Sequence, residues 1–159
     1  MDDPMLPKLD RLVDEIAALH SKLVLLVGPP GCGKTKLLGQ LAASRAAKVM
    51  NVGAELGARL AALPQRQRVL QANVAMRELA DEYASGDLLL LDNIELLFDQ
   101  SLRLDPLDLL KRHAHTRRVV AAWPGQLHEG RLSYAEIGHP EYQDYGLDGL
   151  VPFEIDATG

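Results

Sequence analysis

A lysine and a threonine stand at the end of a glycine-rich stretch near the start of this chain. The stretch reads GPPGCGKT and follows the apolar run LVLLV at 23–27. Glycines let a backbone curl until its N–H groups point at phosphate oxygens, and the N-terminus of a following helix adds partial positive charge. This spacing, between an apolar strand and a helix, predicts a phosphate cradle for a nucleotide such as ATP. The residues expected around the phosphates are Gly28, Pro29, Pro30, Gly31, Cys32, Gly33, Lys34 and Thr35.

A magnesium site is predicted beside this cradle. In the P-loop pattern the lysine, here Lys34, reaches the β- and γ-phosphates, and the hydroxyl of Thr35 ligates Mg²⁺. The run LLLL at 88–91 ends on Asp92. In P-loop NTPases an aspartate after an apolar strand supplies the second metal contact, usually through water. We therefore expect Mg²⁺ to be bound together with ATP, with Thr35 and Asp92 on the metal.

The base that would activate water for hydrolysis is harder to assign. Many ATP-hydrolysing P-loop proteins carry a glutamate directly after the strand aspartate, whereas this chain has Asn93 there. If the chain turns helical, Glu95 lies about one turn from Asp92, and its carboxylate could polarise the attacking water. The same spacing also resembles a capping box, in which Glu95 would only stabilise the start of a helix. Glu55, just beyond the strand predicted at 48–52, is the alternative base.

Three other features of AAA+ ATPases, a γ-phosphate sensor, a helical lid and an arginine finger, have little support in the sequence. A polar residue that senses the γ-phosphate tends to end the strand beside the P-loop strand, but this chain offers Ala121, Ala122 and Trp123 there. No helical lid is expected, because few residues follow the last predicted strand at 150–155. Arg103 is the best candidate for an arginine finger, since it follows the aspartate-bearing strand on the side where open α/β sheets bind ligands.

Apolar periodicity predicts alternating strands and helices. Short apolar runs bounded by turn residues indicate buried strands, and apolar residues spaced by three and four indicate amphipathic helices. The pair Asp105-Pro106 marks a helix start, with the aspartate as N-cap. The order predicts one α/β domain over 1–159: a P-loop NTPase core of the AAA+-like, additional-strand type, with a mostly parallel sheet covered by helices on both faces. Strands are expected at 23–27, 48–52, 88–91, 118–123, 132–137 and 150–155, and helices at 7–21, 34–46, just before Pro64, at 66–84 and from Asp105 to about His115.

Composition and charge exclude several classes of protein. The 159-residue chain has a net charge of −5 and one cysteine. Its surface as a whole is therefore unsuited to nucleic acid, and no internal disulfide can form. The apolar runs are too short to cross a bilayer and no signal peptide is recognisable, so we expect a cytoplasmic protein without a membrane partner.

One basic cluster, KRHAHTRR at 111–118, departs from this acidic character. Its cations could contact DNA phosphates. Cations also gather at helix C-termini, where they complement the helix dipole, so the cluster has a structural explanation as well. The candidate DNA contacts are Lys111, Arg112, Arg117 and Arg118.

Several blocks of the sequence, taken in order, resemble the BrxF family, the small P-loop proteins of type 3 BREX phage-exclusion systems. The blocks are GPPGCGKT, NVGAELGARLAALP, LLLLDNIELLFDQSLRLDPLDLL, VVAAWPG and LSYAEIGHPEY, and they cover most of the chain. The resemblance implies a bacterial cytoplasmic component of an anti-phage system, acting beside a DNA methyltransferase, a large ATPase and other proteins. It also implies a nucleotide site from Gly28 to Thr35 with Asp92. It supplies no catalytic base, so the role of Glu95 depends on the spacing argument alone.

Four functions are compatible with these observations. The first is an ATP-dependent switch, or weak ATPase, whose nucleotide state controls assembly with BREX proteins or with itself. The second is a nucleotide-binding scaffold that does not hydrolyse, suggested by Asn93. The third is a DNA-binding accessory subunit, which only the basic cluster supports. The fourth is a small-molecule kinase, although the arginine-rich lid expected of such enzymes is not evident in the sequence.

Overall fold

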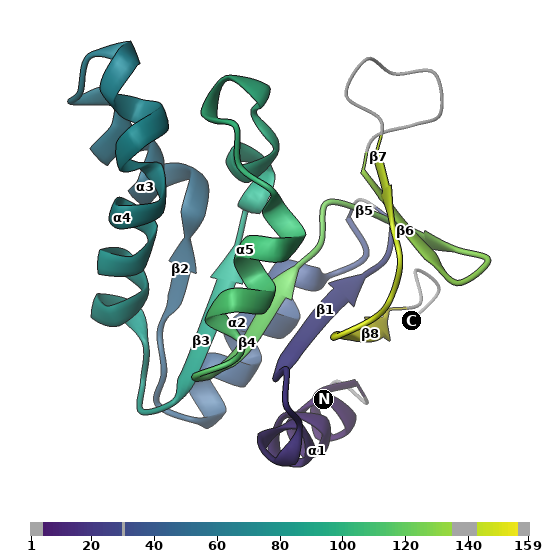
Figure 1. Ribbon diagram of the computed structural model, residues 1–159. Helices are drawn as coiled ribbons and strands as arrows, with labels where there is room; N and C mark the ends of the chain where they lie inside the picture. The colour runs from purple at the N-terminus through teal and green to yellow at the C-terminus, as the bar shows by residue number, and fades with distance from the viewer. Residues whose placement is uncertain (1–4, 30, 135–142, 156–159) are drawn as a thin grey trace.

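Five parallel strands form the central sheet of the protein, in the order β2-β3-β4-β1-β8 (Figure 1). The computed structural model describes residues 5–29, 31–134 and 143–155. The P-loop strand β1 lies between β4 and β8, and β3, which ends on Asp92, lies on the far side of β4. The strands are β1 (Leu23–Val27), β2 (Val49–Asn51), β3 (Leu88–Asp92), β4 (Arg118–Ala122) and β8 (Val151–Glu154).

Helices cover both faces of this sheet, and each face has its own apolar core. Successive side chains of a strand point to opposite faces. In β1, Leu25 belongs to the core under α3, α4 and α5, whereas Leu26 belongs to the core under α1 and α2. Both residues are fully buried, as expected for a parallel sheet enclosed on two sides. The helices are α1 (Met5–Glu15), α2 (Lys34–Ser44), α3 (Val52–Ala61), α4 (Gln65–Tyr83) and α5 (Pro106–His113), with short 3₁₀ turns at Ile16–Ala18, Ile94–Phe98 and Gln100–Leu102.

A second, antiparallel sheet of three strands was not anticipated. The expected strand at 132–137 is β6, which is observed only as Arg131–Tyr134 and does not join the central sheet. It pairs with β5 (Gly125–His128) and β7 (Gln143–Tyr145) instead. Residues 135–137 lie outside the described part of the chain. The small sheet follows β4 directly, so it begins at the edge of the central sheet where the P-loop lies.

The helix boundaries follow local chemistry. The Asp105 carboxylate accepts a hydrogen bond of 3.2 Å from the Asp108 amide, and Pro106 opens α5, so the predicted N-cap is confirmed. The first helix is shorter than predicted. It ends at Glu15, continues as a 3₁₀ turn, and reaches extended backbone at Leu19 before entering β1. Among the described helices, none combines the length and apolar character needed to cross a bilayer.

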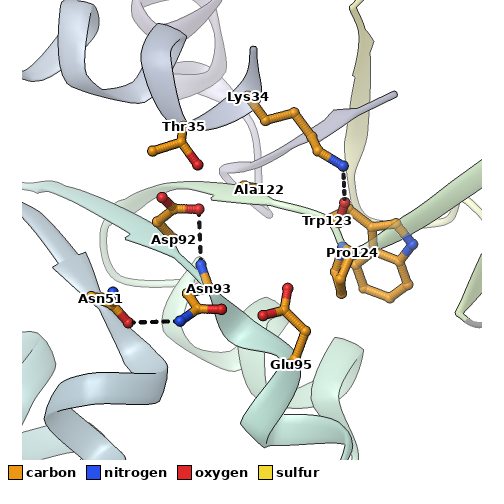
Figure 2. A pocket seen from close by; sticks show the side chains of 9 residues that line it. All are labelled: Lys34, Thr35, Asn51, Asp92, Asn93, Glu95, Ala122, Trp123 and Pro124. Atoms are coloured by element: carbon orange, nitrogen blue, oxygen red, sulfur yellow. Dashed lines mark hydrogen bonds between the residues drawn. The ribbon is translucent and has the colours of Figure 1, made fainter. Parts of the chain in front are cut away.

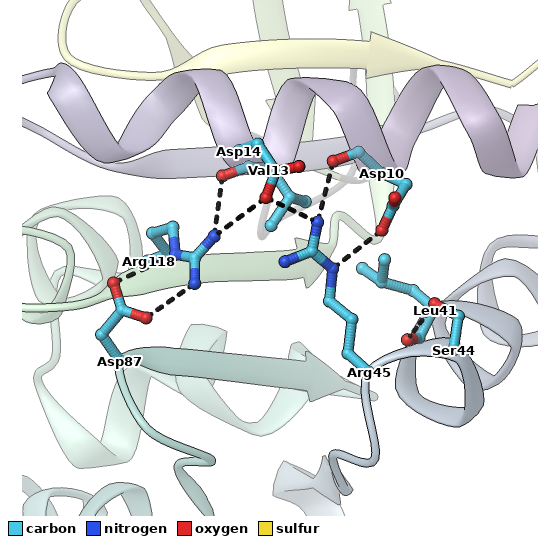
Figure 3. A network of polar contacts seen from close by, with 8 residues as sticks. All are labelled: Asp10, Val13, Asp14, Leu41, Ser44, Arg45, Asp87 and Arg118. Atoms are coloured by element: carbon cyan, nitrogen blue, oxygen red, sulfur yellow. Dashed lines mark hydrogen bonds and ion pairs between the residues drawn. The ribbon is translucent and has the colours of Figure 1, made fainter.

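Two arginines, Arg45 and Arg118, hold α1 against the rest of the domain (Figure 3). Arg45, just after α2, donates a hydrogen bond of 2.8 Å to the Asp10 carboxylate. Arg118, the first residue of β4, donates two hydrogen bonds to Asp87, at 3.0 and 2.7 Å, and a third of 3.1 Å to the Val13 carbonyl. Arg118 is therefore engaged in holding α1 against the start of the sheet.

Candidate nucleotide site

A cleft of about 250 Å³ opens at the carboxyl ends of β1, β3 and β4 (Figure 2). Ligands in open α/β sheets bind at this edge, where the loops after parallel strands meet. Four residues predicted from the sequence to act on the nucleotide meet here: Lys34, Thr35, Asp92 and Glu95. The remaining lining residues are Asn51, Asn93, Ala122, Trp123 and Pro124.

The glycine-rich loop has the geometry that a phosphate cradle requires. Gly33 precedes α2 with φ = 106°, a conformation that L side chains rarely adopt. A Cβ added to Gly28 would lie 2.5 Å from the Cys32 sulfur and 2.9 Å from the Ile155 carbonyl oxygen, so no larger residue fits there. The Cys32 amide donates a hydrogen bond of 3.1 Å to the Pro29 carbonyl and so closes the turn. Pro30, also expected near the phosphates, lies outside the described residues.

Lys34 spans the cleft. Its ammonium donates one hydrogen bond to the Gly28 carbonyl and one to the Trp123 carbonyl, each of 2.9 Å. Both acceptors are main-chain oxygens at strand ends, and no carboxylate of the described residues pairs with the cation. A phosphate oxygen would be a stronger acceptor for this charge than a neutral carbonyl.

Thr35 and Asp92 face one another across the cleft (Figure 2). Thr35 lies in the first turn of α2, and Asp92 is the half-buried last residue of β3. One Asp92 carboxylate oxygen accepts a hydrogen bond of 2.9 Å from the main-chain N–H of Asn93. A hydroxyl and a carboxylate in this arrangement are the oxygen ligands that suit Mg²⁺ bound together with a nucleotide phosphate, so these residues fit the predicted metal.

Glu95 and Asn93 have different surroundings, although both line the cleft. Asn93 adopts a left-handed conformation with φ = 56°, and its side-chain amide donates a hydrogen bond of 3.1 Å to Asn51. The Glu95 side chain projects into the cleft in Figure 2 and forms no hydrogen bond or ion pair with any described residue. Asp92 does not cap the following 3₁₀ turn, since Asn93 takes the N-cap position. The capping-box explanation of Glu95 is therefore wrong.

Two residues expected near the site lie elsewhere. Desolvation, together with the nearby Glu55 carboxylate, raises the pKa of Tyr83. Glu55, the alternative base suggested by the sequence, is not among the residues that line the cleft. Arg103 is exposed at the end of the Gln100–Leu102 turn and is not among the cleft-lining residues either.

Strand β4 lies beside the P-loop strand, and the residue after it, Trp123, lines the cleft. Trp123 presents its main-chain carbonyl there, where AAA+ ATPases tend to have a polar side chain that senses the γ-phosphate. The Trp123 side chain is fully buried, with Phe98 edge-on at 5.3 Å and Tyr145 edge-on at 5.5 Å between ring centroids. Its indole N–H donates a hydrogen bond of 2.9 Å to the Ser133 carbonyl in β6. Burial raises the pKa of Tyr145 to about 12. Trp123 thus connects the cleft, through its own backbone, to the small sheet.

The basic cluster at 111–118 does not form one patch. Arg118 turns toward Asp87 and α1. Lys111 lies against Gly149, where its Cε would be 3.5 Å from an added Cβ. Only Arg112 and Arg117 face a common space, between α4 and α5. The structure therefore does not bring the four side chains that the sequence suggested as DNA contacts together on one surface.

Sequence reasoning missed Asn51 and the carbonyl of Trp123. Asn51 ends β2, caps α3 by accepting a hydrogen bond of 3.0 Å from Ala54, and holds Asn93. A polar residue between a strand and a helix was the available signal for Asn51. A main-chain acceptor leaves no signal in residue type, so the Trp123 carbonyl could not have been found this way.

The family model of the ATPases associated with various cellular activities (AAA) matches residues 24–122, which run from the P-loop strand through β4. The chain belongs to the AAA family of ATPases. Its α/β architecture with a five-stranded parallel sheet is that of the AAA+ core, as the sequence predicted. No curated protein sequence matches the chain significantly.

Solved structures show the same fold at low sequence identity. PCH-2 from C. elegans superposes with a TM-score of 0.52 at 15% identity, over 96% of this chain and 42% of its own. A DNA replication initiation factor superposes with a TM-score of 0.50 at 18% identity, over 94% of this chain and 44% of its own. This chain thus spans less than half the length of each of these proteins.

Proposed function

We propose that this AAA-family domain binds Mg·ATP and hydrolyses it slowly, as a nucleotide-dependent switch whose site is completed by another protein or by a second copy of the chain. The observation that carries the proposal is the convergence of Lys34, Thr35, Asp92 and Glu95 on one cleft from two segments that lie far apart in the sequence. The phosphates would lie in the loop before α2, and Lys34 would exchange its two carbonyl acceptors for phosphate oxygens.

Mg²⁺ would be held by the Thr35 hydroxyl and, through water, by Asp92, and it would neutralise charge on the phosphates. Glu95 is the proposed base. Its carboxylate is exposed in the cleft and forms no hydrogen bond with any described residue, whereas the side-chain amide of Asn93 donates a hydrogen bond to Asn51. A glutamate within reach of the attacking water can accept its proton.

The need for a partner follows from the charges in the cleft. Lys34 is the only cation among the nine described residues that line it. The transition state of phosphoryl transfer carries more charge than one lysine compensates, and an arginine supplied from outside raises turnover by about 10³–10⁵-fold in other NTPases. Because Arg103 does not line the cleft of its own chain, it remains our candidate for insertion into the cleft of a second copy.

The setting we propose is a type 3 BREX system. It is supported by the resemblance of the sequence blocks to the BrxF family, and by nothing in the geometry of the cleft. Co-purification of the chain with the other proteins of such a system, in the presence of ATP and in its absence, tests this setting. Retention by none of them in either state would contradict it.

A single-turnover assay tests the role of Glu95. Glu95→Gln should still bind ATP but lower the rate of hydrolysis by on the order of a hundredfold. Glu55→Gln makes the same chemical change outside the cleft and should leave the rate unaltered. Equal rates for Glu95→Gln and the wild type would exclude Glu95 as the base.

A non-hydrolysing scaffold is the second candidate function, because Asn93 occupies the position where many relatives carry the catalytic glutamate and is held there by Asn51. In that case wild-type protein would retain intact ATP, and Glu95→Gln would change neither binding nor turnover.

A further inference from the structure

A second groove, of about 490 Å³, lies between α4 and α5. Its charged lining comes from the second half of α4 and from the end of α5 with the loop that enters β4. These segments precede β3 and β4, so the groove opens toward the amino ends of the strands, whereas the nucleotide cleft lies at their carboxyl ends. It is therefore separate from the site described above.

Arginines dominate the groove. Arg77, Arg112 and Arg117 line it, with Asp81 as the one carboxylate among the described lining residues. Burial and the neighbouring arginines lower the pKa of His113, which also lines the groove, so this histidine is neutral at pH 7. A net positive groove on a chain of charge −5 is a local reversal of the surface potential.

The three arginines are not equally engaged. Arg117 donates to Asp81 at 2.7 Å and to the Ala80 carbonyl at 3.0 Å, and so fastens the end of α4. Arg112 has one exposed partner, Asp108, at 3.1 Å on its own helix. Arg77 forms no hydrogen bond or ion pair with any described residue. Arg77 and Arg112 therefore have guanidinium donors available to a ligand.

A buried amide on the same helix as Arg77 also lacks a partner. Asn73 lines the groove, and its Oδ1 is buried with no hydrogen-bond partner in the described structure. An unmet buried acceptor is costly, so such groups are normally satisfied. A ligand hydroxyl would satisfy this oxygen, and an amide turned by 180° would instead offer its N–H groups to an oxyanion.

We propose that this groove binds a phosphate group, with Arg77 and Arg112 as its ligating cations. A planar guanidinium offers paired N–H donors that match two phosphate oxygens, which a lysine cannot do. The phosphate could belong to a nucleic-acid backbone or to a small phosphorylated molecule, since both present the same oxygens. The proposal does not depend on ATP hydrolysis at the other edge of the sheet.

The test uses the full chain carrying Lys34→Ala, so that the P-loop no longer competes for phosphate. The probes are inorganic pyrophosphate and a fluorescein-labelled oligothymidylate at low salt. Pyrophosphate binding is followed by the proton NMR signal of His113, assigned with His113→Gln, because a bound anion opposes the nearby arginines and raises the pKa of this histidine. Oligothymidylate binding is followed by fluorescence anisotropy.

Arg77→Gln should weaken binding by about tenfold, the usual consequence of losing one charged hydrogen-bond partner, and adding Arg112→Gln should abolish it. Arg11→Gln removes the same charge from an exposed position on α1, across the sheet, and should have no effect. Binding of both probes at the groove identifies nucleic acid as the source, and binding of pyrophosphate alone identifies a small molecule. Failure of both probes at millimolar concentration, or equal losses with Arg11→Gln, would overturn the proposal.

Discussion

The ammonium of Lys34 donates a hydrogen bond of 2.9 Å to the carbonyl of Trp123, 89 positions further along the chain. The indole of the same tryptophan donates to the Ser133 carbonyl in the small sheet, also at 2.9 Å. A single residue, Trp123, therefore links Lys34 to β6. A nucleotide that draws Lys34 toward its phosphates removes a hydrogen bond from the segment that anchors this sheet, so the two are coupled if the nucleotide states differ in these contacts.

Nucleotide binding should change the fluorescence of Trp123, the only tryptophan in the chain. Its carbonyl loses the Lys34 partner, and the environment of the buried indole shifts with the backbone. Titration with Mg·ATP should give a saturable change in emission, and Lys34→Ala should abolish it. A wild-type spectrum that stays constant while a labelled nucleotide binds would show that the lysine does not act through Trp123.

Trp123→Phe should loosen the small sheet without removing the acceptor of Lys34, which is a main-chain atom. The substitution leaves the carbonyl of the half-buried Ser133 without its indole donor and should lower the free energy of unfolding by about 1–3 kcal/mol. Urea unfolding followed by circular dichroism measures this. Ser133→Ala keeps the carbonyl and should cost far less; equal losses for the two variants would argue against the indole hydrogen bond.

Gly28→Ala and Gly39→Ala should have opposite effects. At Gly28 the new methyl would lie 2.9 Å from the Ile155 carbonyl oxygen, so the loop must shift and ATP affinity should fall at least tenfold. At Gly39, exposed inside α2, nothing lies within 4 Å of an added Cβ. Alanine should therefore stabilise this helix by about 0.5–1 kcal/mol and leave ATP binding intact.

Thermal unfolding and nucleotide titration of both glycine variants check this pair of predictions. Unchanged ATP affinity in Gly28→Ala would mean that the loop can move without cost. A less stable Gly39→Ala would mean that α2 is constrained by contacts other than those described.

How much of the fold and of the site could be predicted depends on how far apart in the sequence the interacting residues lie. The buried strand at 23–27 and the Asp105 cap are set by neighbouring residues, and both are confirmed. That Lys34 and Asp92 lie in one cleft could also be predicted, because the carboxyl ends of parallel strands meet at the same edge of a sheet. The three-stranded sheet depends on pairing between segments whose weak apolar patterns do not state their partners, so its strands were missed or misplaced.

The surroundings of particular side chains were also beyond sequence patterns. Neighbouring cations in KRHAHTRR point in different directions because the helix ends at His113 and a strand begins at Arg118. Arg118 was a candidate DNA contact, yet it is held by Asp87 and by the Val13 carbonyl. That pairing joins positions 31 and 105 apart in the sequence.

The Asp87–Arg118 pair should make stability depend on acid pH. The hydrogen bond from Arg118 lowers the pKa of Asp87 below its ordinary value of 3.8. The stabilisation is therefore fully present above that value and is lost as the pH falls through the lower, folded-state pKa. Because the Asp87 side chain is 53% exposed, the contribution at pH 7 should not exceed about 1 kcal/mol.

Urea unfolding of Asp87→Asn at pH 7 and at acid pH below 3.8 checks this prediction. The variant should be less stable than the wild type at pH 7, and the difference should shrink in acid. Asp148→Asn, at an exposed position with no described partner, serves as control. A difference between Asp87→Asn and the wild type that stays constant with pH would show that the ion pair does not contribute.

Phosphate release from Mg·ATP over a range of protein concentrations would show whether a second protein or copy completes the ATPase site. Turnover per chain should rise with concentration and disappear in Lys34→Ala and in Glu95→Gln. Fast turnover by the dilute protein, independent of concentration, would contradict this expectation, as would phosphate release that survives Lys34→Ala.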